Sequence, residues 1–260
     1  MQGNQAYRLS GNQVDFIAST TTGQLMEDLA MVRMKESVNQ VPKLTDALRE
    51  RAGRSKSAAE KAFCADQIRQ LEAYQAELRD FKLELPTITV DTSYALKDPA
   101  MDLHIDYHGH SHTAGDVFVF CPRQRAIATG DAIHGYFPNI YDGFPRVWPR
   151  TIDSVGQADF KYVLGGHGPV QSDRVVMTSF RNYIEELTEK VAAAKQAGQT
   201  VDEVQQRITV ASLKSLQSNG YADFLTRAGA EMIPHFGLMP PLQMNVNENL
   251  RQVYANLDRV

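Results

Sequence analysis

The spacing of apolar residues changes twice along this chain, and this change constrains its fold more than any other feature of the sequence. Apolar residues recur at helical spacing over about 24–82, form short β-rich segments over 88–128, and return to helical spacing from about 172 onward. A 3.6-residue period predicts amphipathic helices, whereas short apolar runs bounded by Gly, Pro and Asp predict strands. The order therefore predicts an α/β domain with a helical insertion and a helical C-terminal extension.

The insertion is expected to form a helical hairpin. Leu25, Leu29 and Val32 fall at helical spacing after a turn at 20–23, and Pro42 should interrupt or restart this helix, because proline removes a backbone hydrogen bond. A second helix is predicted from Ser55 to about Lys82. Its apolar stripe consists of Ile68, Leu71, Tyr74, Leu78 and Phe81. We expect this stripe to pack against the rest of the domain, and a partner-binding surface is the alternative.

The remaining elements follow from the same patterns. Short strands are predicted at 14–18, 88–90, 93–96, 103–107, 117–121, 126–128 and 162–164. C-terminal helices are predicted at 175–195, at 202–208 with Thr200 as the N-cap, and at 242–257 after a Pro-Pro pair.

Composition narrows the classes of function. The 43% hydrophobic content is enough for a buried core, and the formal net charge of −4 gives no general attraction to nucleic acid. No stretch approaches the roughly 18 consecutive apolar residues of a membrane-spanning helix. Cys64 and Cys121 form neither a disulfide framework nor a CxxC metal site, and we expect both to be small buried hydrophobes. The compartment stays open between cytoplasm and periplasm.

Three short motifs carry the candidate chemistry, and each adjoins a predicted strand: HGHSHTAGD at 108–116, TGD at 129–131 and GGHGP at 165–169. Singly they are weak, because Gly-Asp is also a turn pair and a histidine between glycines is also a loop residue. Together they bring imidazole and carboxylate groups, which zinc and similar cations bind, to the ends of successive strands. The glycines would allow these loops to converge at one edge of the sheet.

The histidines before this first motif have a plainer interpretation. His104, Asp106 and His108 share one face of the predicted strand, opposite its apolar residues, which is typical of a solvated face. The weakest functional hypothesis makes the run from His104 to His112 a simple metal-sequestering segment.

In this order, HTAGD at 112–116, TGD at 129–131 and GHGP at 166–169 resemble the second half of the metallo-β-lactamase superfamily pattern. Trp148 and the residues up to 153 resemble the helix that precedes the last histidine motif. The resemblance implies a metallo-β-lactamase-like αββα sandwich.

The implied sandwich would occupy 1–170, followed by a helical extension over 171–260. Superfamily members carry a His-x-His-x-Asp-His motif upstream, which this chain lacks, and the GNQAY run at 3–7 resembles the segment that comes directly after that motif. We therefore expect an N-terminally incomplete copy without the first strands. An unpaired sheet edge would then favour poor solubility or a homo-oligomer.

The resemblance also assigns the site. His112 would ligate a first metal and His167 a second, while Asp131 would bridge both and serve as the catalytic carboxylate. The metals would share a hydroxide that attacks a carbonyl or phosphoryl centre. Asp116 is expected to hold the turn after His112.

Candidate substrate-binding residues are His110, His134 and Tyr136, although the last two could equally pack against the insertion. Zinc is the expected metal, with iron or manganese as alternatives, and without the upstream motif at most one ion should be held, weakly. Antibiotic-hydrolysing members carry cysteine where this chain has Asp131, which argues against that activity.

The sequence thus predicts an impaired metal-dependent hydrolase that acts on a small ester, thioester or lactam-like molecule. The alternative function is a degenerate, non-catalytic scaffold that binds a partner through its helical insertion.

Overall fold

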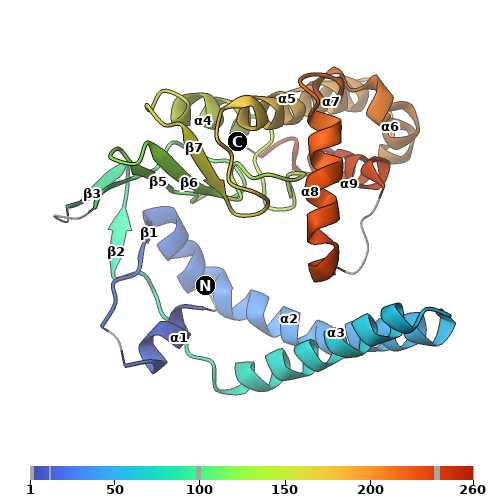
Figure 1. Ribbon diagram of the computed structural model, residues 1–260, viewed down its shortest axis with the longest axis horizontal. Coiled ribbons are helices and arrows are strands. Elements are labelled where there is room, and N and C mark those ends of the chain that lie inside the picture. The colour runs from blue at the N-terminus through green and yellow to red at the C-terminus, as the bar shows by residue number, and fades with distance from the viewer. Residues whose placement is uncertain (1–2, 12, 98–100, 237–240, 260) are drawn as a thin grey trace. The chain divides into compact units, whose positions relative to one another are not determined.

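The computed structural model describes residues 3–11, 13–97, 101–236 and 241–259 (Figure 1). The chain divides into two compact units, Met1–Thr89 and Val90–Val260. The predicted partition into 1–170 and 171–260 rests on family resemblance and not on compactness, and it stays a prediction.

The first unit is built on a hairpin of two long helices. Its elements are α1 (Asn4–Leu9), β1 (Ile17–Ser19), α2 (Thr20–Arg54), α3 (Ala58–Glu77), η1 (Leu78–Asp80) and β2 (Ile88–Val90), and β1 pairs with β2. Helices α2 and α3 pack together, as predicted for the insertion. The predicted stripe, which begins at Ile68 in α3 and ends at Phe81 just after η1, is half-buried.

Two local predictions in this unit are wrong. The residues 20–23, expected to form a turn, begin α2, because the Ser19 side chain accepts a hydrogen bond from the Thr22 amide and caps the helix. Pro42 does not interrupt α2. The buried residues Met34, Val41 and Thr45 continue one helical face past the proline, so packing outweighs the lost hydrogen bond.

The second unit contains a five-stranded sheet. Its strands are β3 (Ser93–Lys97), β4 (Asp102–Asp106), β5 (Phe118–Cys121), β6 (Ala126–Gly130) and β7 (Tyr162–Gly165), in the spatial order β3-β4-β5-β6-β7. All five coincide with predicted strands to within about two residues. Strands β3 to β6 are antiparallel neighbours, whereas β7 runs parallel to β6. Because these last two strands point the same way, the loops after Gly130 and Gly165 leave the sheet at the same edge.

Helices cover the sheet and complete the unit. They are α4 (Trp148–Val155), α5 (Val175–Gln196), α6 (Val201–Arg207), η2 (Val210–Ser212), α7 (Lys214–Gln217), α8 (Tyr221–Phe236) and α9 (Leu242–Asn256). The predicted helices α5, α6 and α9 are confirmed, as is Thr200, which forms a capping box with Glu203. The α/β class, the helical insertion and the helical C-terminal region are therefore confirmed.

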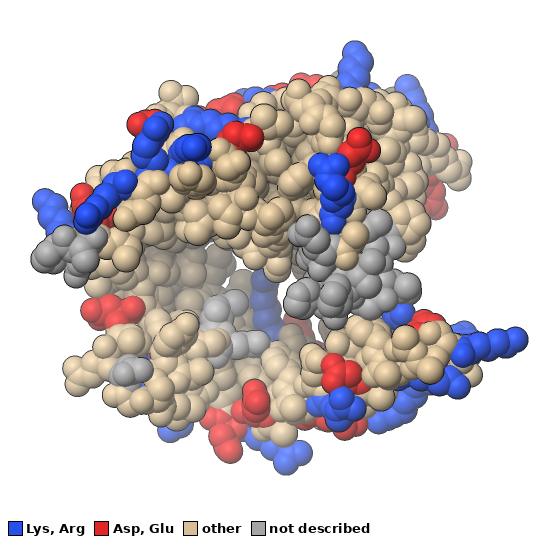
Figure 2. Space-filling model, viewed as in Figure 1, with Lys and Arg blue, Asp and Glu red and all other residues tan. Residues whose placement is uncertain are grey.

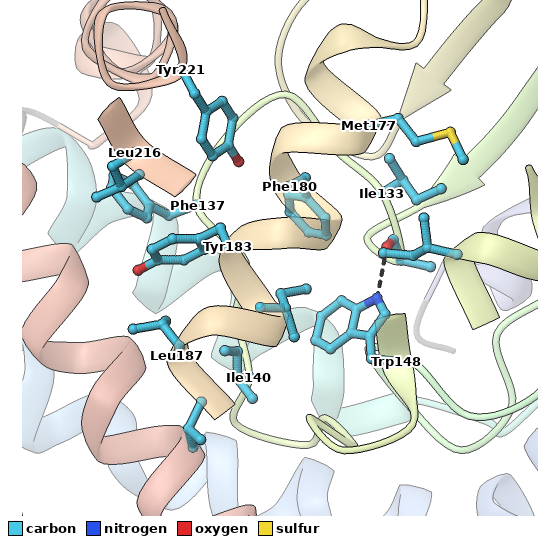
Figure 3. Close-up of a cluster of buried hydrophobic side chains, with 14 of the residues drawn as sticks. Ile133, Phe137, Ile140, Trp148, Met177, Phe180, Tyr183, Leu187, Leu216 and Tyr221 are labelled. Carbon is cyan, nitrogen blue, oxygen red and sulfur yellow. Dashed lines mark hydrogen bonds between the residues drawn. The ribbon is translucent and has the colours of Figure 1, made fainter. Parts of the chain in front are cut away.

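One core joins the sheet to these helices. Phe118, Ile127 and Val163 from the sheet belong to the same buried cluster as Trp148 of α4 and Phe180 of α5. Figure 3 shows Trp148 and Phe180 within this cluster. The indole Nε1 of Trp148 donates a hydrogen bond to the Ala132 carbonyl at 2.9 Å, so the buried polar group has a partner. This contact fixes the start of α4 beneath the loop that follows β6.

The cysteines differ from each other. Cys64 is fully buried, as expected, whereas Cys121 is half-buried at the end of β5 and its thiol donates to Gln124. The prediction that both cysteines are buried is therefore confirmed for Cys64 and wrong for Cys121.

Charged side chains of both signs are interspersed over the face of the molecule drawn in Figure 2. In the parts of the chain that the structure describes, no helix has the length and apolar character needed to cross a membrane.

Candidate functional site

Asp131 and His167 meet at the edge of the sheet where β6 and β7 end. Gly130 and Gly165 are register partners on these parallel strands, so the following loops start side by side. The His167 Nε2 lies 3.5 Å from the Asp131 Oδ1, and the two side chains are 51% and 33% exposed. Two of the three predicted ligands are thus close together and reachable from solvent.

Close backbone contacts hold these loops together. The Gly166 amide donates to the Gly130 carbonyl, and the Gly135 amide donates to the His167 carbonyl, both at 2.8 Å. A Cβ on Gly166 would stand 2.0 Å from the Asp131 Oδ1, so a larger residue there would displace this carboxylate. The glycines before His167 therefore serve the close approach of two loops.

The loop that carries His112 is held by a carboxylate instead. Asp116 accepts hydrogen bonds from the Ser111 hydroxyl at 2.5 Å, the Thr113 amide at 2.7 Å and the Thr113 hydroxyl at 2.6 Å. These contacts agree with the role expected for Asp116. The His112 ring lies 6.0 Å from the Trp148 ring, edge to face.

His134 is buried beneath the Asp131–His167 pair, with only 3% of its surface exposed. Its ring centroid lies 5.6 Å from that of His167 and 5.4 Å from that of Phe180. Burial lowers the pKa of His134 to about 4, against the opposing effect of the Asp131 carboxylate, and its Nδ1 has no hydrogen-bond partner in the described chain. His134 is thus a neutral imidazole with an unused polar atom.

The other two candidates for substrate binding have different surroundings. His110 stacks on Phe144 with ring centroids 4.4 Å apart. The Tyr136 hydroxyl accepts a hydrogen bond from the Asn245 Nδ2 at 3.4 Å, and burial raises the pKa of Tyr136. The assignment of His110, His134 and Tyr136 to substrate stays a prediction.

Of the two earlier histidines, His104 lies on β4 and His108 lies just after this strand. The His104 side chain is 43% exposed, and its Nε2 is 3.6 Å from the Asp102 carboxylate on the same strand. The His108 Nδ1 lies 2.9 Å from the Ser154 hydroxyl, and burial lowers the pKa of His108 despite the nearby Asp106 carboxylate. These contacts agree with the interpretation of His104 as part of a solvated face.

The donor set fits part of a metal centre. Two ligands about 2.0–2.2 Å from a tetrahedral zinc ion stand roughly 3.3–3.5 Å apart. The Asp131–His167 pair has this spacing, at 3.5 Å. Among the described residues, however, no group of three or more His, Cys, Asp or Glu residues is gathered closely enough to hold a metal ion. The pair fits two ligand positions, and the described residues do not form a complete centre.

A structural role for the loop at 132–147 was not predicted from the sequence. This loop follows Asp131 and is hydrogen-bonded to the two histidine motifs. Its Gly135 amide binds the His167 carbonyl at 2.8 Å, and its Phe144 amide binds the Ser111 carbonyl at 3.0 Å. The available signal was the frequency of apolar residues in a segment without helical or strand period. Ile133 and Ile140 are fully buried here, which is unusual for a loop.

No family model and no curated protein matches this chain. Solved structures do. A metallo-β-lactamase from Pontibacter korlensis is 23% identical with a TM-score of 0.35, and the match covers 43% of this chain and 54% of that one. The inverting sec-alkylsulfatase Pisa1 from Pseudomonas sp. is 13% identical with a TM-score of 0.48, covering 69% and 30%. The DIM-1 metallo-β-lactamase is 18% identical with a TM-score of 0.36, covering 44% and 55%.

The chain therefore spans between 30% and 55% of these proteins. The predicted resemblance to metallo-β-lactamase-fold proteins is confirmed as a partial likeness of fold. At these identities and TM-scores it supports no particular activity.

Proposed function

We propose that this chain contributes the Asp131–His167 side of a metal-dependent hydrolytic centre of the metallo-β-lactamase type. The observation that carries the proposal is the 3.5 Å spacing of a carboxylate oxygen and an imidazole nitrogen at the edge where two parallel strands end. Both groups are ligands that zinc prefers, and a site at the C-terminal ends of such strands is open to loops from several directions.

Spacing alone would not distinguish this pair from an ordinary surface pair. His104 and Asp102 are 3.6 Å apart, but they sit two residues apart on one strand and are 43% and 52% exposed. Asp131 and His167 come from separate loops that glycine contacts press together. An arrangement that depends on such close packing favours a specific role for the pair.

The proposed activity is weak. Because the described residues do not complete a zinc shell, we expect this chain to hold at most one ion loosely, with zinc ahead of iron or manganese. The substrates to screen are small esters, thioesters and lactam-like molecules. Hydrolysis should be slow, since the donor set covers two ligand positions only.

A non-catalytic scaffold is the second candidate, and one feature of α2 favours it. Leu25, Leu29 and Val32 lie at helical spacing and are 38%, 38% and 51% exposed. Exposed apolar side chains on one helical face are a feature of partner-binding surfaces. Such a partner could also be a second copy of the chain.

The test is zinc content after equilibrium dialysis, measured by elemental mass spectrometry on the wild-type chain and its variants. We expect His167→Ala and Asp131→Asn each to remove most of the bound zinc. The matched control is His104→Ala, which disrupts the pair on β4 and should retain it. His112→Ala reports whether the third predicted ligand takes part.

Zinc retained in both His167→Ala and Asp131→Asn would contradict the proposal. Zinc lost only in His104→Ala would instead support the metal-sequestering segment. A folded wild-type chain without zinc would favour the scaffold.

A further inference from the structure

One face of α9 carries a row of side-chain amides. Asn245, Asn249, Gln252 and Asn256 are spaced four, three and four residues apart, so they lie above one another along the helix. All four contact the loop that follows Asp131.

The contacts of the last three are directed at the backbone of this loop. The Asn249 Nδ2 donates to the Pro138 carbonyl at 2.7 Å, and the Gln252 Oε1 accepts from the Ile140 amide at 2.7 Å. The Asn256 Nδ2 donates to the Ile140 carbonyl at 2.6 Å and to the next carbonyl at 2.9 Å. The amides therefore serve as the hydrogen-bond partners that a strand or helix would otherwise provide.

These contacts matter because much of the loop is buried. Ile140 is fully buried and Asn249 is only 3% exposed. Backbone groups removed from water need partners, and leaving one without a partner is costly. The buried loop at 132–147 therefore depends on α9 for its conformation.

Both ends of the same loop hold the candidate ligands. The Gly135 amide binds the carbonyl of His167, and the Phe144 amide binds the carbonyl of Ser111, which precedes His112. We propose that the amide face of α9 is a positioning element, which sets the distance between Asp131, His167 and His112 through this loop. The proposal rests on the proposed function, since it concerns the same site.

Helix α9 is well placed to act in this way. It packs against α5, the long helix of the core (Figure 1), where the Tyr183 hydroxyl donates to the Asn249 Oδ1 at 3.1 Å. A positioning residue needs such rigid support to fix its partner.

A matched control lies on the same helix. The Gln243 Nε2 donates to the Ile208 carbonyl at 3.3 Å, and its Oε1 accepts from the Val210 amide at 2.8 Å. Gln243 is therefore another α9 amide that binds backbone, but it binds the segment after α6 instead of the site loop. Gln243→Ala removes contacts of the same kind without touching the loop at 132–147.

The experiment compares Asn256→Ala, Asn249→Leu and Gln243→Ala by hydrogen–deuterium exchange with peptide resolution and by zinc affinity. We expect exchange in 132–147 and in both histidine loops, 108–116 and 165–169, to accelerate roughly tenfold in the two asparagine variants. Zinc affinity should fall roughly tenfold in the same variants, which is typical when the residues that orient ligands are lost. In Gln243→Ala, faster exchange should be confined to the residues near 208–210, and zinc affinity should be unchanged.

Two results would overturn the inference. In the first, exchange in the asparagine variants rises within 132–147 while both histidine loops stay as protected as in the wild type. In the second, Gln243→Ala changes both histidine loops equally. If Asn249→Leu does not fold, Asn256→Ala decides alone, because Asn256 is only half-buried. A wild-type chain without zinc contradicts the proposed function, and the exchange experiment still tests the positioning role.

Discussion

The two loops that carry His112 and His167 are held in place by different means. The His167 loop is pressed against the Asp131 loop by glycine backbone, with a 2.8 Å hydrogen bond on each side of the contact. The His112 loop is organised by the Asp116 carboxylate, which accepts three hydrogen bonds from Ser111 and Thr113. One arrangement depends on the absence of side chains, and the other depends on a single charged side chain.

This difference predicts which substitutions each loop should tolerate. A loop held by close approach responds to added volume, because packed backbone cannot give way easily. A loop held by a carboxylate responds to the loss of charge, because charge-assisted hydrogen bonds are stronger than neutral ones. Substitutions in the two loops should therefore differ in both size and kind of effect.

The largest effect is expected from Asp116→Ala. Removing three hydrogen bonds to a carboxylate should lower the free energy of unfolding by about 3 kcal/mol, measured by urea denaturation. The control is Asp159→Ala, because the Asp159 carboxylate is 81% exposed and pairs only with Arg125 among its described contacts. That surface pair should contribute at most about 1 kcal/mol. Equal losses in both variants would contradict the distinction.

Gly165→Ala tests the loop held by close approach. A Cβ at this position would stand 2.6 Å from the His134 Cα and 2.8 Å from the Ile133 carbonyl oxygen, and neither is the flexible end of a side chain. We expect a loss of about 2 kcal/mol in the same denaturation measurement. Gly53→Ala is the control, since its Cβ would meet nothing within 4 Å, and it should be neutral or slightly stabilising. Unchanged stability in Gly165→Ala would mean that the loops can separate.

Gly166→Ala should separate stability from metal binding. Its Cβ would stand 2.0 Å from the Asp131 Oδ1, which belongs to a side chain that can rotate. The loss in the free energy of unfolding should be about 1 kcal/mol, because the partly exposed Asp131 side chain can move. Zinc affinity should fall roughly tenfold, because the carboxylate leaves His167. Wild-type zinc affinity in a folded Gly166→Ala chain would argue against the Asp131–His167 pair as ligands.

The smallest effect concerns a second carboxylate, which binds the first residues of α7. Glu186 accepts hydrogen bonds from the Lys214 amide at 3.0 Å, the Ser215 amide at 2.8 Å and the Ser215 hydroxyl at 2.7 Å. Burial raises the pKa of Glu186, but these hydrogen bonds outweigh burial and leave its pKa below the usual 4.5. The contribution of Glu186 to stability is thus present above about pH 4.5 and is lost as pH falls through the lower, folded-state pKa.

We therefore expect Glu186→Gln to flatten the acid side of the stability curve by roughly a few tenths of a kcal/mol, because burial opposes the hydrogen bonds and leaves a small net effect on the pKa. Thermal unfolding between about pH 3 and pH 7 would measure it, on the order of one degree. If the stability of Glu186→Gln fell more steeply at acid pH than that of the wild type, the prediction would be contradicted. A flattening as large as the stability loss in Asp116→Ala would show that the hydrogen bonds to Glu186 outweigh its burial by far more than expected.

Elements whose signals are local could be predicted from the sequence. Alternating or short apolar runs located strands β3 to β7, and apolar periodicity with the Thr200 cap located α5 and α6. The sequence also predicted that Asp131 and His167 lie at the same edge of the sheet, because each residue closely follows a strand.

Features that depend on residues far apart in the chain could be seen only in the folded structure. Helix α2 continues through Pro42 because packing on either side outweighs a local preference. The 3.5 Å distance between Asp131 and His167 depends on glycines packed between loops, and the loop at 132–147 depends on amides of α9 more than a hundred residues later. Such contacts leave no periodic trace in the sequence, because a backbone carbonyl in a loop can be satisfied by an amide from any part of the chain.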